Sequence, residues 1–592
     1  MILKKPLFWI IFIIAAVICT LFSFKYFPSA FPLVTLDLKM DRKGALDSAG
    51  FIAAKFNLGP DDYSQAASFR LNSEVQNFVE LEAGGNRAFA DMLKQGLYHP
   101  YTWAVRHYKE DIVNETLIRF TPNGKPCGFR EKLSEAEPGS SLTMDTALTI
   151  AEYEAKEKWK IDLSAYKLVE KSREDLPGGR TDYRFVYERT DVKIGEGTYR
   201  LRLVTGGHRL TELTHFINIP ESFSRRYKQM RSANNTMAFS AMAAMGIIYI
   251  LGGCIIGLFF LYRHGLVLWR QALFWGVTIA LLQVFSGLND LPLAWMDYDT
   301  ALSAKGFLLK EFIQLFAVFI QFTVLLTITF MAAEGLTRTA FPGHIQFWRL
   351  WAVHNANSQQ VTGRTSGGYL LIPLFFAFEV ILYFISNKFL GWWSPSSALF
   401  NPDIMASYFP WLGSISGSLF AGFWEECMFR AVPIAGAALI GKRLGRRKLW
   451  IFGAFILQAI IFGAGHADYP TQPAYARLVE LIIPSMGFGL LYLYFGLLPS
   501  IILHFSFDVV WLAMPLFIST AQGGWINKIM VAFFALIPVW IVIGSIIRRK
   551  KWSAISGDDY NGSWKPPLKA VKTADILETF AAGEISSRKK NL

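Results

Sequence analysis

Residues 421–430, AGFWEECMFR, place two adjacent glutamates and an arginine inside a long apolar stretch. A carboxylate at the centre of a bilayer costs at least about 2.5 kcal/mol, so such a charge is rarely accidental. Glu426 and Arg430 are four residues apart and can pair along one helical face, whereas Glu425 is rotated by about 100°. The pair has a structural interpretation, because an unpaired buried charge is far more costly. Glu425 is left without a charge partner in its own helix.

Two histidines also lie in apolar stretches, His466 at the end of IIFGAGH and His504 at the start of HFSFD. Asp508 follows His504 by four residues and shares its helical face. Together with Glu425 these groups can hold a water molecule: a carboxylate takes its proton, one histidine orients it or binds a metal, and a second histidine stabilises an oxyanion. Any one of them alone is also explained as a hydrogen bond between helices, but the set is harder to explain in that way.

The composition indicates that these segments cross a bilayer. Of the 592 residues, 52% are hydrophobic and only 18% are charged, below the roughly 25% of a soluble protein. The net charge of +13 comes from basic residues in short loops between apolar runs, which is the positive-inside pattern and argues against nucleic-acid binding. The four cysteines are scattered and form no CxxC motif, so neither disulfides nor cysteine chemistry are expected.

The order of apolar and polar segments predicts ten membrane spans. Residues 1–25 predict an uncleaved anchor, because no convincing cleavage site follows the apolar run. Nine further spans are expected at 237–262, 268–288, 307–333, 369–389, 407–439, 449–467, 476–496, 499–519 and 527–547. Basic residues occupy alternate loops, so both termini are expected in the cytoplasm and residues 26–235 outside it, in a protein of the inner (plasma) membrane.

The chain thus divides into five parts: an anchor, an extracytoplasmic domain, accessory transmembrane helices, a membrane core that holds the polar residues and a basic cytoplasmic tail. Their boundaries are 1–25, 26–235, 236–366, 367–548 and 549–592. Glu379 and Glu480 also lie in apolar spans but belong to no motif, and a structural role is the simpler interpretation for both.

The extracytoplasmic domain contains a degenerate internal repeat. GALDSAGFIAAKFNLGPDDY (44–63) resembles TALTIAEYEAKEKWKIDLSAY (146–166), each with apolar residues at helical spacing before a turn. In each half an aromatic-rich strand follows, and a second strand enters an NG or GG turn that favours a hairpin. These strands lie at 101–108 and 116–125, and at 182–189 and 199–208. The fold expected is α+β, resembles PepSY-type modules, and can bind a regulator or a substrate without catalysis of its own.

The three polar motifs resemble those of the CPBP family of intramembrane proteases, which includes the CaaX prenyl-endopeptidases and bacteriocin-processing or immunity relatives. The family pattern is EExxxR, then FxxxH, then HxxxN or HxxxD on successive helices, and it reads EECMFR, FGAGH and HFSFD here. Order, spacing and membrane setting match over residues 369–522, and three linked motifs are more specific than one. The resemblance implies that Glu425 is the general base for water, that Glu426 and Arg430 support it, and that His466 positions the water or binds a metal.

By the same resemblance, His504 and Asp508 form an oxyanion-stabilising pair or further metal ligands. Asp508 stands where asparagine is common in the family. An ionised aspartate cannot donate a hydrogen bond, so it suits orienting His504 or binding a metal. A site with zinc or another divalent metal at His466 and His504 and a metal-independent site with a glutamate-activated water both stay open, since no HExxH motif is present.

The expected function is that of an intramembrane metallo- or glutamyl endopeptidase that cuts a membrane-associated protein or peptide. The alternative is a non-enzymatic transporter or sensor that uses the same buried polar residues. No inverted repeat relates the halves of the membrane region, which counts against a transporter. Intact Glu425, His466 and His504 count against a degenerate, sensor-only core.

Catalysis requires convergence, and straight helices do not provide it. They would put Glu425 at mid-membrane, His466 near the outer end of its span and His504 near the inner end of its own. Gly463, Gly465, Pro484 and Pro499 are the residues expected to shift these helices. The catalytic groups should then lie within about 4–7 Å of one another, close enough to share one water.

Overall fold

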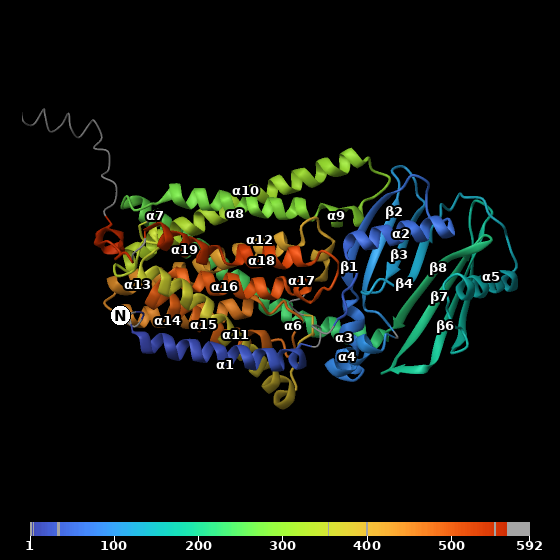
Figure 1. Cartoon of the computed structure of the whole chain (residues 1–592), viewed down its shortest axis with the longest axis horizontal. Helices are drawn as coiled ribbons and strands as arrows, with labels where there is room; N and C mark the ends of the chain where they lie inside the picture. The colour runs from blue at the N-terminus through green and yellow to red at the C-terminus, as the bar shows by residue number, and fades with distance from the viewer. Residues whose placement is uncertain are drawn as a thin grey trace, which may run out of the picture.

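The computed structural model is a bundle of long helices with a β-sheet domain at one end (Figure 1). It describes residues 3, 5–31, 36–96, 98–352, 354–397, 401–549 and 552–564. Helix α1 (Pro6–Ala30) lies along the outside of the bundle, with the N-terminus at the end remote from the sheet. Most of the tail predicted at 549–592 lies outside the described residues.

The sheet domain contains eight antiparallel strands in the order β1-β2-β3-β4-β8-β7-β6-β5. They are β1 (Ser64–Leu71), β2 (Tyr101–Tyr108), β3 (Glu115–Phe120), β4 (Pro126–Lys132), β5 (Tyr166–Asp175), β6 (Thr181–Ile194), β7 (Gly197–Gly206) and β8 (Arg209–Asn218). The predicted NG and GG hairpins are confirmed, since they join β3 to β4 and β7 to β8. Strands β4 and β8 are the return strands of these hairpins, and β1 and β5 are additional to the strands predicted from sequence.

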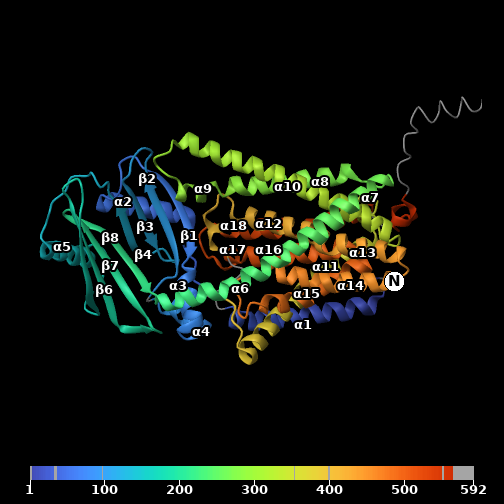
Figure 2. The same ribbon diagram turned by 180° about the vertical axis from the view of Figure 1, so that it is seen from behind.

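Each half of the sheet domain starts with one helix before four strands, α2 (Arg42–Phe56) and α5 (Met144–Glu157). The Asp41 side chain caps α2 by accepting from Gly44 N at 2.7 Å, and the Thr143 hydroxyl caps α5. Alanines at every fourth position of both helices are buried, so the helices pack closely on the sheet (Figure 2). Helices α3 (Ser73–Glu82) and α4 (Gly85–Gln95) are inserted in the first half only. The two-repeat, PepSY-like interpretation stays a prediction.

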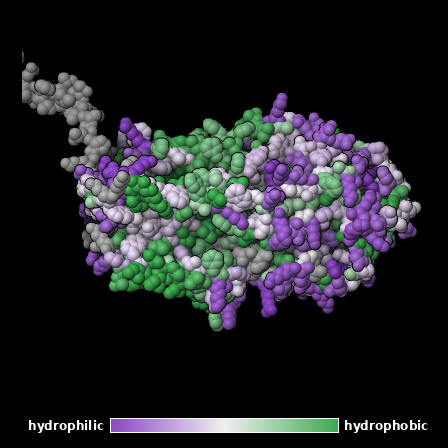
Figure 3. Space-filling view, in the orientation of Figure 1, coloured by the Kyte–Doolittle hydropathy of each residue, from purple (hydrophilic) through white to green (hydrophobic). Residues whose placement is uncertain are grey.

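The bundle is that of a helical membrane protein. By length and apolar composition, seven described helices can cross a membrane, or eight if the bent pair α18 (Trp525–Ala535) and α19 (Ile537–Arg549) counts as one span. The seven are α1, the continuous helix 221–263, α8 (Trp269–Asn289), α10 (Ala304–Ala340), α11 (Gln359–Leu390), α14 (Arg447–Gly465) and α15 (Ala476–Phe495). Their apolar surface forms a band between two hydrophilic ends (Figure 3). The exact count of ten spans stays a prediction.

The helix at 221–263 runs from the sheet domain along the bundle to its opposite end (Figure 2). It is built from α6 (Glu221–Met245), the π-helical segment η3 (Gly246–Ile256) and α7 (Gly257–Arg263). Within η3, the ring of Tyr249 packs at right angles on that of Phe429, with 5.8 Å between centroids. The helix therefore begins well before the span predicted at 237–262.

The remaining predicted spans are interrupted helices. The segment predicted at 407–439 forms α12 (Pro410–Glu425), the π-helical turn η7 (Glu426–Ala431) and α13 (Val432–Arg443), and that at 499–519 forms α16 (Leu497–Leu512) and α17 (Met514–Ile518). The span predicted as one helix at 527–547 bends by 61° between α18 and α19. Pro538 at the start of α19 explains this bend, because proline removes a helical hydrogen bond.

Hydrogen bonds hold the sheet domain against one end of the bundle. Glu80 of α3 accepts from Trp393 Nε1 at 2.9 Å, and Asp403 accepts from the backbone N of Phe69 at 3.0 Å. Arg106 of β2 donates to the backbone carbonyl of Tyr298, near the short helix α9 (Leu291–Ala294). The ends of α7 and α13, with their basic residues, lie at the opposite end of the bundle (Figures 1 and 2).

One prediction concerns the stability of the sheet domain. His107 of β2 is buried, and its ring stacks on Tyr63 with 3.9 Å between centroids. Burial lowers the pKa of His107 to about 4, against an ordinary value near 6.5. The unfolded chain therefore binds a proton that the folded domain does not, and stability falls as pH drops from about 6.5 towards 4.

We expect the melting temperature of the solubilised full chain to fall less steeply over this pH range in His107→Gln than in the wild type. Circular dichroism during heating measures it. The matched control is His208→Gln, at an exposed turn of the same domain, which should keep the wild-type slope. Parallel slopes for His107→Gln and the wild type would contradict the prediction.

Candidate active site

The two adjacent glutamates lie where an α-helix changes into a π-helix. Glu425 is the last residue of α12, and Glu426 opens the π-helical turn η7, all six residues of which are buried. A π-helical turn holds an extra residue and re-aims the side chains around it, and such turns are frequent at functional sites. The two glutamates therefore leave one helix in different directions, as their spacing predicts, but in a turn wider than an α-helix.

Two glycines allow the surrounding helices to approach. A Cβ added to Gly422 of α12 would lie 3.1 Å from the backbone N of Phe505 in α16, and one on Gly463 of α14 would lie 2.8 Å from the carbonyl O of Leu478 in α15. The close approach predicted at Gly463 is present, whereas the nearest atom to a Cβ on Gly465 is at 3.9 Å, an ordinary contact. Gly422, which sequence reasoning did not single out, is what brings α12 onto α16.

Glu426 links two of the motifs. Its Oε2 lies 3.5 Å from Arg430 Nε, which is the pair expected from their spacing, and both side chains are fully buried. Its Oε1 accepts a hydrogen bond from His504 Nδ1 at 2.8 Å, a contact that the sequence analysis missed. Since a carboxylate only accepts, Nδ1 of His504 carries the proton and the ring is fixed with Nε2 on its other side.

Arg430 is enclosed by aromatic rings as well as by its carboxylate partner. Its guanidinium lies 4.1 Å from the ring centroid of Phe462 and 5.0 Å from that of Phe488. Nη2 also donates to Ser485 Oγ at 3.2 Å. Cation–π contacts are strongest where the cation is desolvated, so these two rings help to stabilise a charge that the bilayer would otherwise exclude. The FxxxH motif thus contributes Phe462 as well as its histidine.

Glu425 and Asp508 flank the other nitrogen of His504. Its Nε2 lies 3.6 Å from Glu425 Oε2 and 3.5 Å from Asp508 Oδ2. The side chains of Glu425 and Asp508 are 17% and 28% exposed, whereas Glu426 is fully buried. Of the two adjacent glutamates, only Glu425 therefore reaches space that a water molecule can occupy.

His466 lies beside this cluster, immediately after the end of α14. Its Nδ1 donates to the carbonyl of Phe462 at 2.8 Å, which leaves Nε2 as the acceptor. The Phe462 ring lies 4.6 Å from the His466 ring and 6.2 Å from the His504 ring, centroid to centroid. The two histidines therefore contact one aromatic ring, whereas the expected distance of about 4–7 Å between His466 and Glu425 stays a prediction.

The donors present do not form a recognised metal site. In the described part of the chain, no three His, Cys, Asp or Glu side chains are grouped so that they could hold a metal ion. His504 also has one nitrogen engaged with Glu426. A metal at His466 and His504 stays a prediction.

Comparison with known families assigns the segment that carries these motifs. Residues 407–510 match the family model described as type II CAAX prenyl endopeptidase Rce1-like. The match includes all three motifs and lies inside the range of the resemblance at 369–522, and it supports the assignment to the CPBP/CAAX proteases. Searches of curated proteins and of solved structures gave no significant match.

The buried pair generates a prediction about folding. In Glu426→Ala, Arg430 loses its carboxylate and His504 loses its acceptor, so we expect a loss of about 3–5 kcal/mol in stability. Thermal unfolding and the yield of folded, solubilised protein measure it. The double variant Glu426→Ala, Arg430→Met removes the unpaired cation and should recover part of the loss, and the partly exposed Glu425→Ala should cost little. A double variant no more stable than Glu426→Ala would argue against the pairing.

Proposed function

We propose that this chain, whose residues 407–510 form a domain of the CPBP/CAAX protease family, is an intramembrane endopeptidase that acts by a glutamate-activated water. The observation that carries the proposal is the partly exposed side chain of Glu425, whose buried Oε2 has no hydrogen-bond partner in the described residues and lies 3.6 Å from His504 Nε2. Its substrate is a protein or peptide associated with the membrane. The family name does not itself make a CaaX peptide the substrate.

In the proposed reaction, Glu425 takes a proton from a water molecule that His466 Nε2 helps to position. The water oxygen attacks the carbonyl carbon of the peptide bond, and a tetrahedral oxyanion forms. His504 donates from Nε2 to that oxyanion, because Nε2 faces the same space as Glu425. The C–N bond then breaks, and Glu425 passes its proton to the leaving nitrogen.

The neighbouring charges prepare His504 for this role. Its Nδ1 is held by Glu426, so Nε2 points towards Glu425 and Asp508. Carboxylates on both sides favour a proton on Nε2, which an oxyanion donor needs. Asp508 acts by orienting and charging His504 rather than by donating to the oxyanion itself.

The membrane orientation belongs to the same proposal. The ends of α7 and α13 carry Arg263, Lys442 and Arg443 and lie at the end of the bundle remote from the sheet. The positive-inside rule then puts both termini in the cytoplasm and the sheet domain outside it. There the sheet domain is free to bind a regulator or the substrate before it reaches the centre.

The general-base role is tested with Glu425→Gln. We expect cleavage of membrane-associated peptides by the purified, reconstituted chain to fall at least about 100-fold, because an amide cannot take the proton, while the melting temperature is unchanged. Asp508→Asn is the matched control: it keeps the shape, the family often carries asparagine there, and it should retain more activity. Glu425→Gln as active as the wild type would remove the assignment, and ion flux lost in that variant would point to a transporter instead.

Metal removal is a separate test. In the metal-free reaction, incubation with a chelator such as EDTA leaves the cleavage rate unchanged. Inhibition by the chelator with recovery on adding Zn²⁺ would contradict that form of the mechanism and favour a metal held by His466 and His504. The variant His466→Gln, assayed with and without Zn²⁺, would then show whether the histidine is a ligand.

A further inference from the structure

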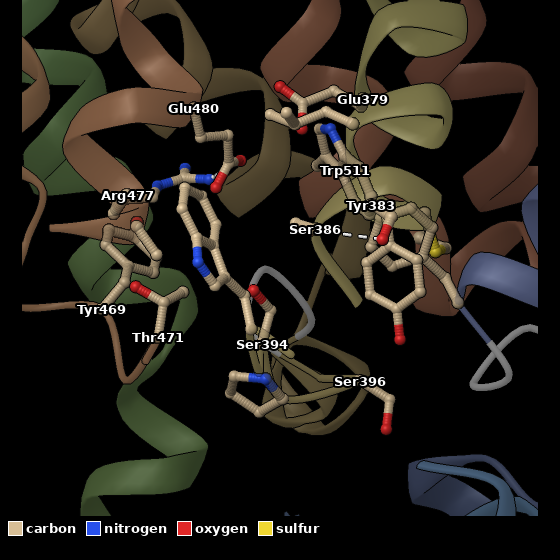
Figure 4. Close-up of a pocket in the computed structure, with 16 residues that line it drawn as sticks. Glu379, Tyr383, Ser386, Ser394, Ser396, Tyr469, Thr471, Arg477, Glu480 and Trp511 are labelled. Carbon is tan, nitrogen blue, oxygen red and sulfur yellow. Dashed lines mark hydrogen bonds and ion pairs between the residues drawn. The ribbon is translucent and has the colours of Figure 1, made fainter. Parts of the chain in front are cut away.

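A cavity lies at the sheet-domain end of the bundle, between α11, α15 and α16 (Figure 4). It has room of about 60 Å³ for water-sized molecules, and it is lined by both charged and aromatic side chains. Glu379 of α11 and Arg477 and Glu480 of α15 face it from opposite sides. Glu379 and Glu480, which belong to none of the three motifs, therefore line the same cavity.

This cavity holds two carboxyl groups and one guanidinium. Arg477 Nη1 forms an ion pair with Glu480 Oε1. Glu379 interacts electrostatically with both of these side chains and shares a hydrogen bond with Glu480, so one of the two carboxyls holds a proton. A cationic group bound in the cavity would take the place of that proton and let both carboxyls be ionised without an uncompensated charge.

Two hydrogen-bond donors also face the cavity without a partner. Among the described residues, neither Thr471 Oγ1 nor Arg477 Nε has a hydrogen-bond partner, although both atoms are buried. Thr471 as a whole is only 2% exposed. Buried polar groups are nearly always paired, so unpaired donors indicate a missing acceptor. The cavity thus offers carboxylates for a cation and, beside them, donors for an oxygen.

The cavity adjoins the proposed catalytic centre. Trp511, which lines it, is three residues after Asp508 on the same face of α16. The guanidinium of Arg477 lies 5.0 Å from the ring centroid of Tyr469, and that ring in turn stacks on His466 with 6.2 Å between centroids. A molecule held in the cavity is therefore next to the place where the peptide bond would react.

We propose that this cavity binds the free amino terminus of a peptide. Glu379 and Glu480 bind the ammonium group, and the donors of Arg477 and Thr471 bind the first carbonyl oxygen. Trp511 contacts the first side chain. A primary ammonium next to a carbonyl oxygen is the one feature of a peptide that matches carboxylates and donors placed side by side.

Calling that peptide the substrate rests on the proposed function. The enzyme would then cut close to an amino terminus, so another endoproteolytic cleavage must first expose that terminus on the sheet-domain side. The chemistry of binding, in contrast, does not depend on cleavage and can be tested without it.

The test measures binding of small probes to the full chain in detergent, carrying Glu425→Gln so that nothing is cleaved. The probes are glycine N-octylamide, its N-acetyl form and n-octylammonium, titrated by calorimetry. We expect acetylation, which removes the charge, to weaken binding about ten- to hundredfold, and n-octylammonium, which lacks the carbonyl, to bind more weakly than glycine N-octylamide. Equal binding of the acetylated and free probes would overturn the proposal.

Variants assign the two halves of the site. Glu379→Gln should weaken both charged probes, whereas Thr471→Val should weaken only glycine N-octylamide. Glu334→Gln is the matched control and should bind the probes as the parent does. Glu334 is also buried, but it is paired with Arg338 at 2.6 Å and does not line the cavity. Unchanged binding in Glu379→Gln would overturn the ammonium site. If Thr471→Val prefers glycine N-octylamide over n-octylammonium as strongly as the parent does, the carbonyl site is overturned.

A second measurement covers the case in which a variant does not fold. A hydrophobic carbodiimide should label Glu379 or Glu480 in the wild-type chain, and glycine N-octylamide should protect them, as read by mass spectrometry. Labelling that the probe does not reduce would overturn the proposal. If the probes discriminate but the wild-type chain cleaves no peptide, the protease is wrong and the amino-terminus site stands.

Discussion

The neutralisation of Arg430 inside the bilayer is the constraint on which the rest of the site depends. A guanidinium can stay there only with a carboxylate beside it, and Glu426 supplies one of its oxygens for this purpose. The other oxygen of the same carboxylate holds His504. The charge that must be stabilised therefore also fixes the histidine, and the histidine brings α16 to Glu425. The Glu426 carboxylate therefore both stabilises the buried guanidinium and sets the position of His504.

The two contacts of the Glu426 carboxylate explain why the adjacent glutamates have different surroundings. Both oxygens of Glu426 lie against buried partners and its side chain is fully buried, so solvent does not reach it. Glu425, one position earlier and outside the π-helical turn, is turned towards accessible space and meets only the edge of the His504 ring. A single uniform helix would give the pair a different angular separation. The change of helix type at this point gives the two glutamates different surroundings: Glu426 contacts Arg430 and His504, and Glu425 is partly exposed.

Much of the site was readable in the sequence because charges in apolar runs are rare and their spacing is periodic. The Glu426–Arg430 pair, the two hairpins of the sheet domain and the membrane class all follow from such local rules. What the sequence did not reveal depends on distant segments meeting. The bond from Glu426 to His504, the rings of Phe462 and Phe488 over Arg430 and the clustering of Glu379 with Arg477 and Glu480 join helices far apart in the chain.

The continuous helix at 221–263 has a mechanical meaning. It begins beneath the sheet domain at Glu221, and Tyr249, about 42 Å further along at 1.5 Å per residue, touches Phe429 inside the π-helical turn. A continuous helix resists bending, so it connects the sheet domain rigidly to the turn that carries Glu426 and Arg430. A tilt of the sheet domain relative to the bundle would be transmitted along this helix to the contact between Tyr249 and Phe429.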